Sequence, residues 1–386
     1  MQKEIKHIYL HIPFANSNRF AKSEVDMYFF ALKNEFDKFF KKKEIASNLR
    51  TLYVASDISD TYLLEKLLDF LNYTKTYLVF SPEIEFSLEL RPNKFAEHVL
   101  QSLFDIGINR IVLKFYSFNE KYAKLSGNQH NSEIPELISK IRNYGINNIS
   151  GDFIYNYPAQ SDDELKFDLQ NVILYGFKHI YISEFLNPSL GSNIEIYSDE
   201  DISSLEYSAE LNKDLNPMIS NDREREFYHY VRKFFCENNL KHYELYGFAQ
   251  NQEFFSKHNL AYWRGEEYLG FGSAAASYFN AKRFSNFSNL NKYIESKLSA
   301  NKYEFIEFID REEAKREFFL LRFNNLDGFS EKEYWEIFGE QISQTILDKL
   351  EYFVDKGWLK RNSYNYALSS LGLDFVDYIL REILYS

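Results

Sequence analysis

The first 190 residues alternate short apolar segments with longer amphipathic ones, and this alternation constrains the fold more than any other feature. Six segments have the length and apolar content of buried strands: 5–14, 49–55, 84–90, 109–116, 148–155 and 179–185. The segments between them have helical periodicity: 25–41, 61–71, 95–105, 133–144 and 162–175. Gly107, Gly145 and Gly176 each precede a strand, where a helix usually ends. These units predict a parallel sheet with right-handed crossovers, either as a TIM-like barrel or as an open doubly wound sheet.

The pattern changes after residue 190. Residues 195–238 have a helical pattern that Pro217 interrupts, and residues 243–287 are rich in Tyr, Gly and Phe, which predicts irregular strands and loops. The last part, 311–386, predicts three helices, a hairpin around residues 362–365 and a final helix, an order typical of a winged helix. We therefore expect three parts: a barrel over 1–190, a helical and irregular β segment over 191–304, and an acidic winged-helix-like domain over 305–386.

The charge of the chain argues against the nucleic-acid binding that a winged helix usually indicates. Lys and Arg number 45 and Asp and Glu 57, a formal net charge of −12, and residues 305–386 hold 10 basic against 16 acidic side chains. A DNA-binding surface needs a basic face to neutralise phosphates. No apolar run approaches the roughly 20 residues of a membrane span, and the first residues show no apolar signal-peptide core. We expect a cytoplasmic protein that binds no nucleic acid and has no integral membrane segment.

Function is expected where the predicted strands end, because ligands of parallel α/β sheets bind at the carboxyl ends of the strands. The first strand leads into HIPFANSNRFAK at 11–22, and the second into ASDIS at 55–59. The third strand leads into ELRP at 89–92, and the fifth into YNYPAQ at 155–160. A further polar and aromatic segment, KHNLAYW, follows at 257–263.

Together these segments resemble the HemW-type haem chaperones, relatives of oxygen-independent coproporphyrinogen III oxidase in the radical S-adenosylmethionine (SAM) superfamily. The similarity extends from about residue 8 to residue 384, and its most specific part is 257–263, which matches the HNxxYW motif of that family. The resemblance implies an α/β fold: a partial (β/α)6 TIM-like barrel of the radical SAM type. A mixed β/helical segment and a winged-helix-like helical C-terminal domain would follow it.

The cluster motif of the family is not matched. In the family, HIPF precedes three cysteines that hold a [4Fe–4S] cluster, and here these positions are Ala15, Arg19 and Lys22. Alanine has no donor atom and arginine does not deprotonate to become a ligand, whereas an iron–sulfur cluster needs several thiolates. The single cysteine, Cys236, cannot supply three ligands. We expect no [4Fe–4S] cluster and no radical SAM coproporphyrinogen oxidase activity.

The SAM-binding part of the family's site is altered as well. The corresponding positions here are Ala55, Ser56, Asp57, Glu89, Arg91 and Asn156. The glycine-rich segment whose backbone contacts SAM in the family has lost its glycines at 55–57, and Asn156 and Ala159 stand at further glycine positions. A Cβ atom at such a position prevents the close approach of the backbone to a ligand. We therefore expect no SAM binding.

Charged side chains replace the cluster and SAM at the strand ends. They are Arg19, Lys22, Asp57, Glu89, Arg91 and Lys114. One interpretation is an anion site, because guanidinium groups bind carboxylates and phosphates through paired hydrogen bonds. The other is a set of internal ion pairs that fills the space, and we favour it because no phosphate-binding loop accompanies these residues.

The HNxxYW motif supplies candidate haem-binding residues. They are His258, Asn259, Tyr262 and Trp263. The resemblance implies that His258 could be an axial ligand, since imidazole is a common donor to haem iron. The alternative is a structural turn in which His258 and Asn259 bond the backbone and Trp263 packs in the core. The family's glycine and histidine after the next strand are Ala274 and Ala276 here, and no other histidine has metal-site spacing, so we expect no metal ion.

We interpret the chain as a degenerate HemW-like protein that is non-catalytic and binds haem or acts as a haem chaperone. Its candidate partners are haem and a haem-acceptor protein. Two alternatives stay open: a scaffold or interaction protein with no tetrapyrrole, and a metal-independent enzyme that uses the charged cluster on an anionic substrate.

Overall fold

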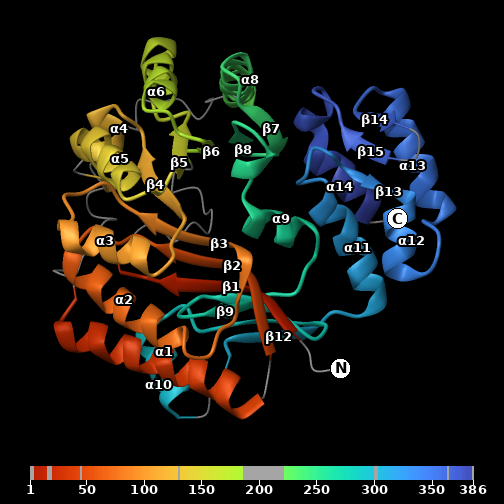
Figure 1. Cartoon of the computed structure of the whole chain (residues 1–386). Helices are drawn as coiled ribbons and strands as arrows, with labels where there is room; N and C mark the ends of the chain where they lie inside the picture. Colours follow the sequence, from red (N-terminus) through yellow and green to blue (C-terminus); the bar gives the residue numbers. More distant parts are fainter. Residues whose placement is uncertain are drawn as a thin grey trace.

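The six predicted strands lie side by side in one parallel sheet (Figure 1). The computed structural model describes residues 4–14, 20–43, 46–128, 131–185, 221–299, 303–362 and 365–384. The strands are β1 (Glu4–Ile12), β2 (Ala46–Ser56), β3 (Phe80–Leu90), β4 (Arg110–Tyr116), β5 (Asn148–Tyr155) and β6 (His179–Glu184). Each pairs in parallel with its sequence neighbour, from β1–β2 to β5–β6. The predicted partial (β/α)6 barrel is therefore confirmed.

Helices connect these strands and pack their apolar sides against the sheet (Figure 1). They are α1 (Lys22–Lys43), α2 (Thr61–Thr74), α3 (Glu97–Asp105), α4 (Glu120–Leu125), α5 (Ile134–Asn143) and α6 (Asp162–Leu174). The short helix α4 escapes the periodicity analysis, because six residues hardly exceed one and a half turns. Gly107, Gly145 and Gly176 follow their helices with φ of 92°, 93° and 68°, as expected for residues that end a helix in the left-handed region.

The middle of the chain extends this sheet at both edges. Strand β9 (Leu269–Phe271) pairs in parallel with β1, while β8 (Gly247–Ala249) pairs antiparallel with β6 and with β7 (Lys241–Glu244). The irregular strands predicted for this segment are thus present. Helix α9 (Lys257–Trp263) was not expected there, because seven residues are too few to show periodicity; the Ser256 side chain caps it by accepting from the Asn259 amide.

A buried carboxylate joins the middle segment to the first helix. Glu35 on α1 accepts from Lys297 Nζ at 3.0 Å, and the two side chains are 5% and 0% exposed. Lys297 lies on α10 (Leu290–Leu298), which packs against α1. Glu35 also accepts from Tyr293 Oη at 2.8 Å, Asn286 Nδ2 at 2.9 Å and the Gly272 amide at 3.1 Å. Its buried charge is therefore compensated from three segments of the chain.

The remaining described elements complete the middle and C-terminal parts. They are α8 (Asn221–Glu237), β10 (Ala276–Tyr278), β11 (Lys282–Ser285), β12 (Phe305–Phe308), α11 (Arg311–Arg322), β13 (Phe329–Ser330), α12 (Glu331–Phe338), α13 (Gln344–Asp355), β14 (Leu359–Asn362), β15 (Asn365–Leu368) and α14 (Val376–Leu384). Helix α8 is the part of the predicted helical segment 195–238 that lies within the described residues, and Pro217 lies outside them. The order of three helices, a hairpin and a final helix in the tail is confirmed.

Four hydrophobic clusters lie within the described residues, and two of them are large. The larger core contains residues between Ile5 and Tyr293, so the middle segment shares it with the barrel strands. The smaller core contains residues between Phe318 and Ile383 and lies within the C-terminal helices and hairpin. The exact domain limits at 190 and 304 remain predictions.

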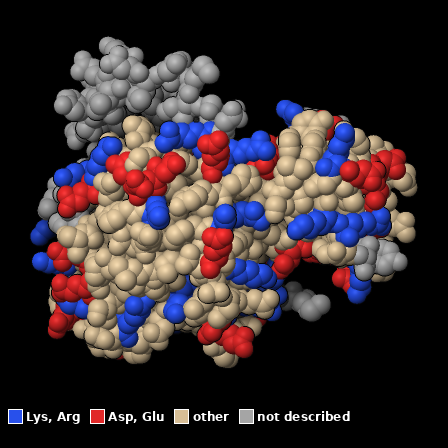
Figure 2. Space-filling model, turned by 90° about the horizontal axis from the view of Figure 1, so that it is seen from above, with Lys and Arg blue, Asp and Glu red and all other residues tan. Residues whose placement is uncertain are grey.

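The surface shows mixed charge. Basic and acidic side chains lie intermixed over the face seen in Figure 2. Within the described residues, no helix has the length and apolar character needed to cross a membrane.

Candidate functional site

The candidate site lies where β2, β3 and β4 end. Lys114, on β4, places Nζ 3.1 Å from Asp57 Oδ1 and 3.3 Å from Glu89 Oε2. Arg91, directly after β3, places Nε 3.4 Å from Asp57 Oδ1. The parallel register brings these residues together, because the carboxyl ends of neighbouring strands meet at the same edge of the sheet. We call Asp57, Glu89, Arg91 and Lys114 the strand-end cluster.

Neutral groups add further hydrogen bonds to this cluster. Glu89 accepts from the Ser56 amide at 3.0 Å and from Tyr53 Oη at 2.7 Å. Arg91 Nη1 donates to the carbonyl of Ser126 and to Asn128 Oδ1, each at 3.3 Å. The two basic and two acidic side chains are therefore bonded to one another and to the barrel, as in the interpretation of internal ion pairs.

Not every residue predicted for this cluster joins it. Arg19, like Ala15, lies outside the described residues. Lys22 is exposed at the start of α1, with Nζ 5.3 Å from the centre of the Tyr62 ring, so it does not belong to the strand-end cluster. Asn156 lies further along the sheet and donates to Glu184 Oε1 at 2.7 Å.

Asp152 is a titratable residue near this cluster that the sequence analysis missed. It lies on β5, and burial, followed by the negative charge of Glu89, raises its pKa to about 7. Burial alone would also raise the pKa of Asp57, but Lys114 and Arg91 outweigh it and hold that pKa below its ordinary value. The charge of an aspartate inside a predicted buried strand was the signal that could have identified Asp152.

Three non-glycine residues near the strand ends have a left-handed backbone conformation. Asn156, Ala159 and Ala274, which stand at glycine positions of the resembling family, have φ of 62°, 55° and 57°. This left-handed region costs a residue with a Cβ atom about 1–2 kcal/mol, with Asn affected least. At these three positions the backbone conformation would cost glycine less free energy than it costs the residue present.

His258 lies at the inner side of the barrel and is 1% exposed. Its Nδ1 is 2.7 Å from Thr51 Oγ1, its Nε2 is 2.7 Å from Tyr262 Oη, and its ring stacks on Tyr53. Burial, with a smaller contribution from His7, lowers its pKa to about 3, so the ring is neutral near pH 7. Both ring nitrogens are engaged with protein atoms, an arrangement that leaves neither one directed at an iron ion.

The other motif residues are organised by Glu244. This carboxylate, 1% exposed, accepts from Trp263 Nε1 at 2.6 Å and from Asn259 Nδ2 at 3.4 Å. Burial raises its pKa. The structural alternative for the motif differs from this geometry in its details. The side chains of His258 and Asn259 bond other side chains rather than the backbone, and Trp263 is half-buried and bonded to Glu244 rather than part of a hydrophobic core.

Metal ligands are sparse in the described part of the chain. It contains no group of three or more His, Cys, Asp and Glu side chains arranged to hold a metal ion. Cys236 is exposed on α8.

Comparisons with known proteins place the chain beside the family that its motifs indicate. No protein-family model matches it. The heme chaperone HemW of Lactococcus lactis is 26% identical over 361 residues, which cover 89% of this chain and 90% of that protein. HemW of Bacillus subtilis is 25% identical over 390 residues, covering 95% of this chain and 96% of that protein. The resemblance to HemW is therefore confirmed along nearly the whole chain.

A solved structure shows the same fold. Coproporphyrinogen III oxidase (HemN) from Escherichia coli, described as a radical SAM enzyme, superimposes with a TM-score of 0.78 at 15% identity. The match covers 99% of this chain and 90% of that one. At this identity the likeness concerns the fold alone.

Proposed function

We propose that this HemW-like chain handles haem without catalysis, using the radical SAM fold with neither an iron–sulfur cluster nor SAM. Haem handling is supported by similarity to proteins named heme chaperones over nearly their whole length. The absence of cluster chemistry is supported by the residues at the strand ends.

The residues do not fit a [4Fe–4S] cluster. The three positions that carry cysteine in the family are Ala15, Arg19 and Lys22, and the chain's single cysteine is exposed on α8. An iron–sulfur cluster of this kind is held by several thiolates. No step of the proposed function therefore runs through a cluster.

The strand-end cluster is the observation that carries the proposal. Lys114 and Arg91 are paired with Asp57 and Glu89, so two positive charges meet two negative charges at the strand ends, where the resemblance implies the SAM site of the family. A SAM molecule at this place would have to displace these ion pairs. The same balance disfavours the metal-independent enzyme, because it leaves no excess positive charge for an anionic substrate.

Haem handling in this proposal does not use His258 as a ligand. Ligation would require the ring to give up its bond to Thr51 or to Tyr262 within a site that is 1% exposed. Loss of the bond to Tyr262 would leave that hydroxyl without its hydrogen-bond partner, whereas Thr51 would keep its bond to His7 Nδ1 at 2.9 Å.

Anaerobic iron–sulfur reconstitution tests the cluster part of the proposal. The wild type should retain little iron and acid-labile sulfide after desalting. The matched control is the triple variant Ala15→Cys, Arg19→Cys, Lys22→Cys, which restores three thiolates at the family's spacing and should retain about four irons per chain. Calorimetric titration with SAM should show no binding to the triple variant, because the strand-end cluster is still present. Four irons per wild-type chain would contradict the proposal.

Haemin titration tests the haem part. Saturable binding at a stoichiometry of one haemin per chain supports haem handling, whereas weak, unsaturable absorbance is expected of haemin on apolar surface. The second candidate function, a scaffold or interaction protein without tetrapyrrole, is favoured by the complete bonding of both His258 nitrogens. Unsaturable haemin binding would select that candidate.

A further inference from the structure

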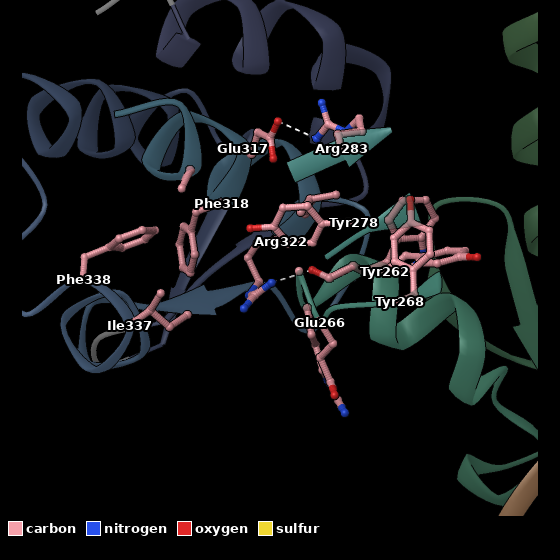
Figure 3. Close-up of a pocket in the computed structure, with 15 residues that line it drawn as sticks. Tyr262, Glu266, Tyr268, Tyr278, Arg283, Glu317, Phe318, Arg322, Ile337 and Phe338 are labelled. Atoms are coloured by element: carbon pink, nitrogen blue, oxygen red, sulfur yellow. Dashed lines mark hydrogen bonds and ion pairs between the residues drawn. The ribbon is translucent and has the colours of Figure 1, made fainter. Parts of the chain in front are cut away.

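A cavity of about 370 Å³ lies outside the barrel, between helix α9 and the C-terminal helices. One wall consists of tyrosines and the other of apolar side chains from α11 and α12: Tyr262, Tyr268 and Tyr278 on one side, and Phe318, Leu321 and Phe338 on the other. Figure 3 shows Phe318, Ile337 and Phe338 facing the tyrosine side across the cavity. This volume falls within the range of small-molecule sites, roughly 300–1,000 Å³.

The charged residues along the walls are bonded to other protein groups. Arg283 places Nη2 2.5 Å from Glu317 (Figure 3). Its Nη1 lies 2.8 Å from Glu307. Arg322, which is 5% exposed, donates to the Trp263 carbonyl at 2.6 Å and to Glu333 at 2.8 Å. These two arginines hold neighbouring segments of the cavity wall together, and their positive charges are neutralised by the carboxylates that they contact.

Arg264 differs from these arginines. It lines the cavity and is exposed, and its side chain makes no hydrogen bond or ion pair with any residue that the structure describes. The remaining acidic lining residue, Glu266, is 3.1 Å from His7 Nε2. The charge of Arg264 also acts on Glu266, whose pKa is lowered first by its hydrogen bond to His7 and to a smaller extent by Arg264. The cavity therefore combines aromatic and aliphatic walls with one guanidinium group whose hydrogen-bond donors have no partner among the described residues.

We propose that this cavity binds a small aromatic molecule that carries a carboxylate or sulfonate group. The ring system would pack between the tyrosines and Phe318, and Arg264 would bind the anion through charge-assisted hydrogen bonds. A ligand in this position touches both α9 and the C-terminal domain. The cavity shares Tyr262 and Trp263 with the HNxxYW motif, but neither His258 nor any of the cluster positions lines it, so the inference does not rest on axial ligation by His258 or on the missing cluster.

Two fluorescent probes of similar shape and different charge test this site on the full chain. Anilinonaphthalene sulfonate is anionic, and N-phenylnaphthylamine is its neutral counterpart. Both should bind the wild type saturably at one site. Arg264→Glu should weaken the anionic probe at least about tenfold, the size expected for a lost charge-assisted hydrogen bond, and leave the neutral probe unchanged. Lys124→Glu, at a residue 72% exposed on α4, is the charge-matched control and should change neither affinity.

A variant with a larger side chain inside the cavity tests whether the probes bind there. Ala314, on α11, lines the cavity, and Ala314→Trp should weaken both probes at least about tenfold. Ile337→Glu, at a residue 51% exposed on the cavity wall, serves if circular dichroism shows that Ala314→Trp does not fold. Unchanged binding of both probes in the folded filling variant would overturn the site. The role of Arg264 would be overturned if the anionic probe bound wild type and Arg264→Glu equally well. It would also be overturned if Arg264→Glu weakened both probes to the same extent.

Discussion

Lys114 Nζ lies 3.1 Å from Asp57 Oδ1, and this ion pair joins β4 to the end of β2 across the intervening strand β3. Glu89 at the end of β3 completes the bridge from the other side of the ammonium group. Three neighbouring strands are thus tied at their carboxyl ends by one lysine.

Lys114→Met should destabilise the protein, because it leaves Asp57 and Glu89 facing each other without their shared cation. The side chains of Lys114 and Glu89 are 19% and 11% exposed, and that of Asp57 is 34% exposed. We expect a loss of about 2 kcal/mol in the free energy of unfolding, below the value for a fully buried pair because solvent reaches Asp57. Urea denaturation measures it. Lys124→Met is the surface control and should stay within about 0.5 kcal/mol of wild type; equal effects of the two variants would refute the prediction.

Asp152→Asn should stabilise the protein in a pH-dependent way. The pKa of Asp152 is raised to about 7 by burial and by Glu89, so folding takes up a proton between pH 4 and 7 and stability falls as the pH rises through this window. The variant lacks this titration. The free energy of unfolding of the variant minus that of wild type should grow by at least about 1 kcal/mol between pH 4 and 7 and stay constant above pH 7. Denaturation curves recorded at each pH measure this difference.

Asp57→Asn should change the stability of the protein with pH in the opposite direction. Lys114 and Arg91 lower the pKa of Asp57 against the effect of burial, so its contribution to stability is present at neutral pH and disappears as the pH falls below about 4. The variant should therefore be less stable than wild type at pH 7 and lose this deficit in acid. If the stabilities of Asp152→Asn and Asp57→Asn, each relative to wild type, changed with pH in the same direction, the raised pKa of Asp152 and the lowered pKa of Asp57 would both be contradicted.

Replacing two left-handed alanines with glycine should stabilise the fold. Ala159→Gly and Ala274→Gly relieve φ values of 55° and 57°, and each should raise the free energy of unfolding by about 1 kcal/mol. Ala314→Gly, within helix α11, should instead lower it by about 1 kcal/mol. Thermal and urea unfolding of the three variants should show a higher free energy of unfolding for Ala159→Gly and Ala274→Gly and a lower one for Ala314→Gly. If all three variants were less stable than wild type, the left-handed alanines would not be strained.

His258→Ala should change stability rather than haem binding. The substitution removes the hydrogen-bond partner of the Tyr262 hydroxyl, leaves Thr51 bonded to His7 alone, and opens a space in the barrel, which together cost about 3 kcal/mol. Haemin titration of folded wild type and variant should give the same spectra. A sharp Soret band that is present in wild type and lost in His258→Ala would instead identify axial ligation by this residue.

Lys297→Met should be strongly destabilising. It removes the cation from Glu35, whose side chain is 5% exposed, and breaking a buried pair in this way typically costs about 3–5 kcal/mol. The double variant Lys297→Met, Glu35→Leu should recover part of the loss, since it removes the uncompensated charge. A single variant as stable as wild type in urea would show that the pair does not support the contact between α1 and α10.

The strands and most helices of the barrel could be predicted from sequence because their apolar periodicity is local. The motif at 257–263 could be identified in the same way, but the partners of His258 could not. Thr51 lies 207 residues away and reaches His258 only through the folded sheet. Glu35 and Lys297 likewise read as ordinary surface charges, since nothing in their sequence neighbourhoods reveals that each is buried beside the other. Asp152 was missed for a related reason: its pKa depends on charges from β3 and β4.

The parallel pairing of β1 with β9 has a consequence for biosynthesis. Leu10 on β1 lies opposite Phe271 on β9, so about 260 residues must leave the ribosome before the first strand gains its second neighbour. At about 5–20 residues per second, translation of that length takes roughly 13–50 seconds. Until then one edge of β1 offers unpaired backbone groups that can pair with other nascent chains. The N-terminal strand is therefore the segment that a chaperone would most need to shield while this protein is being made.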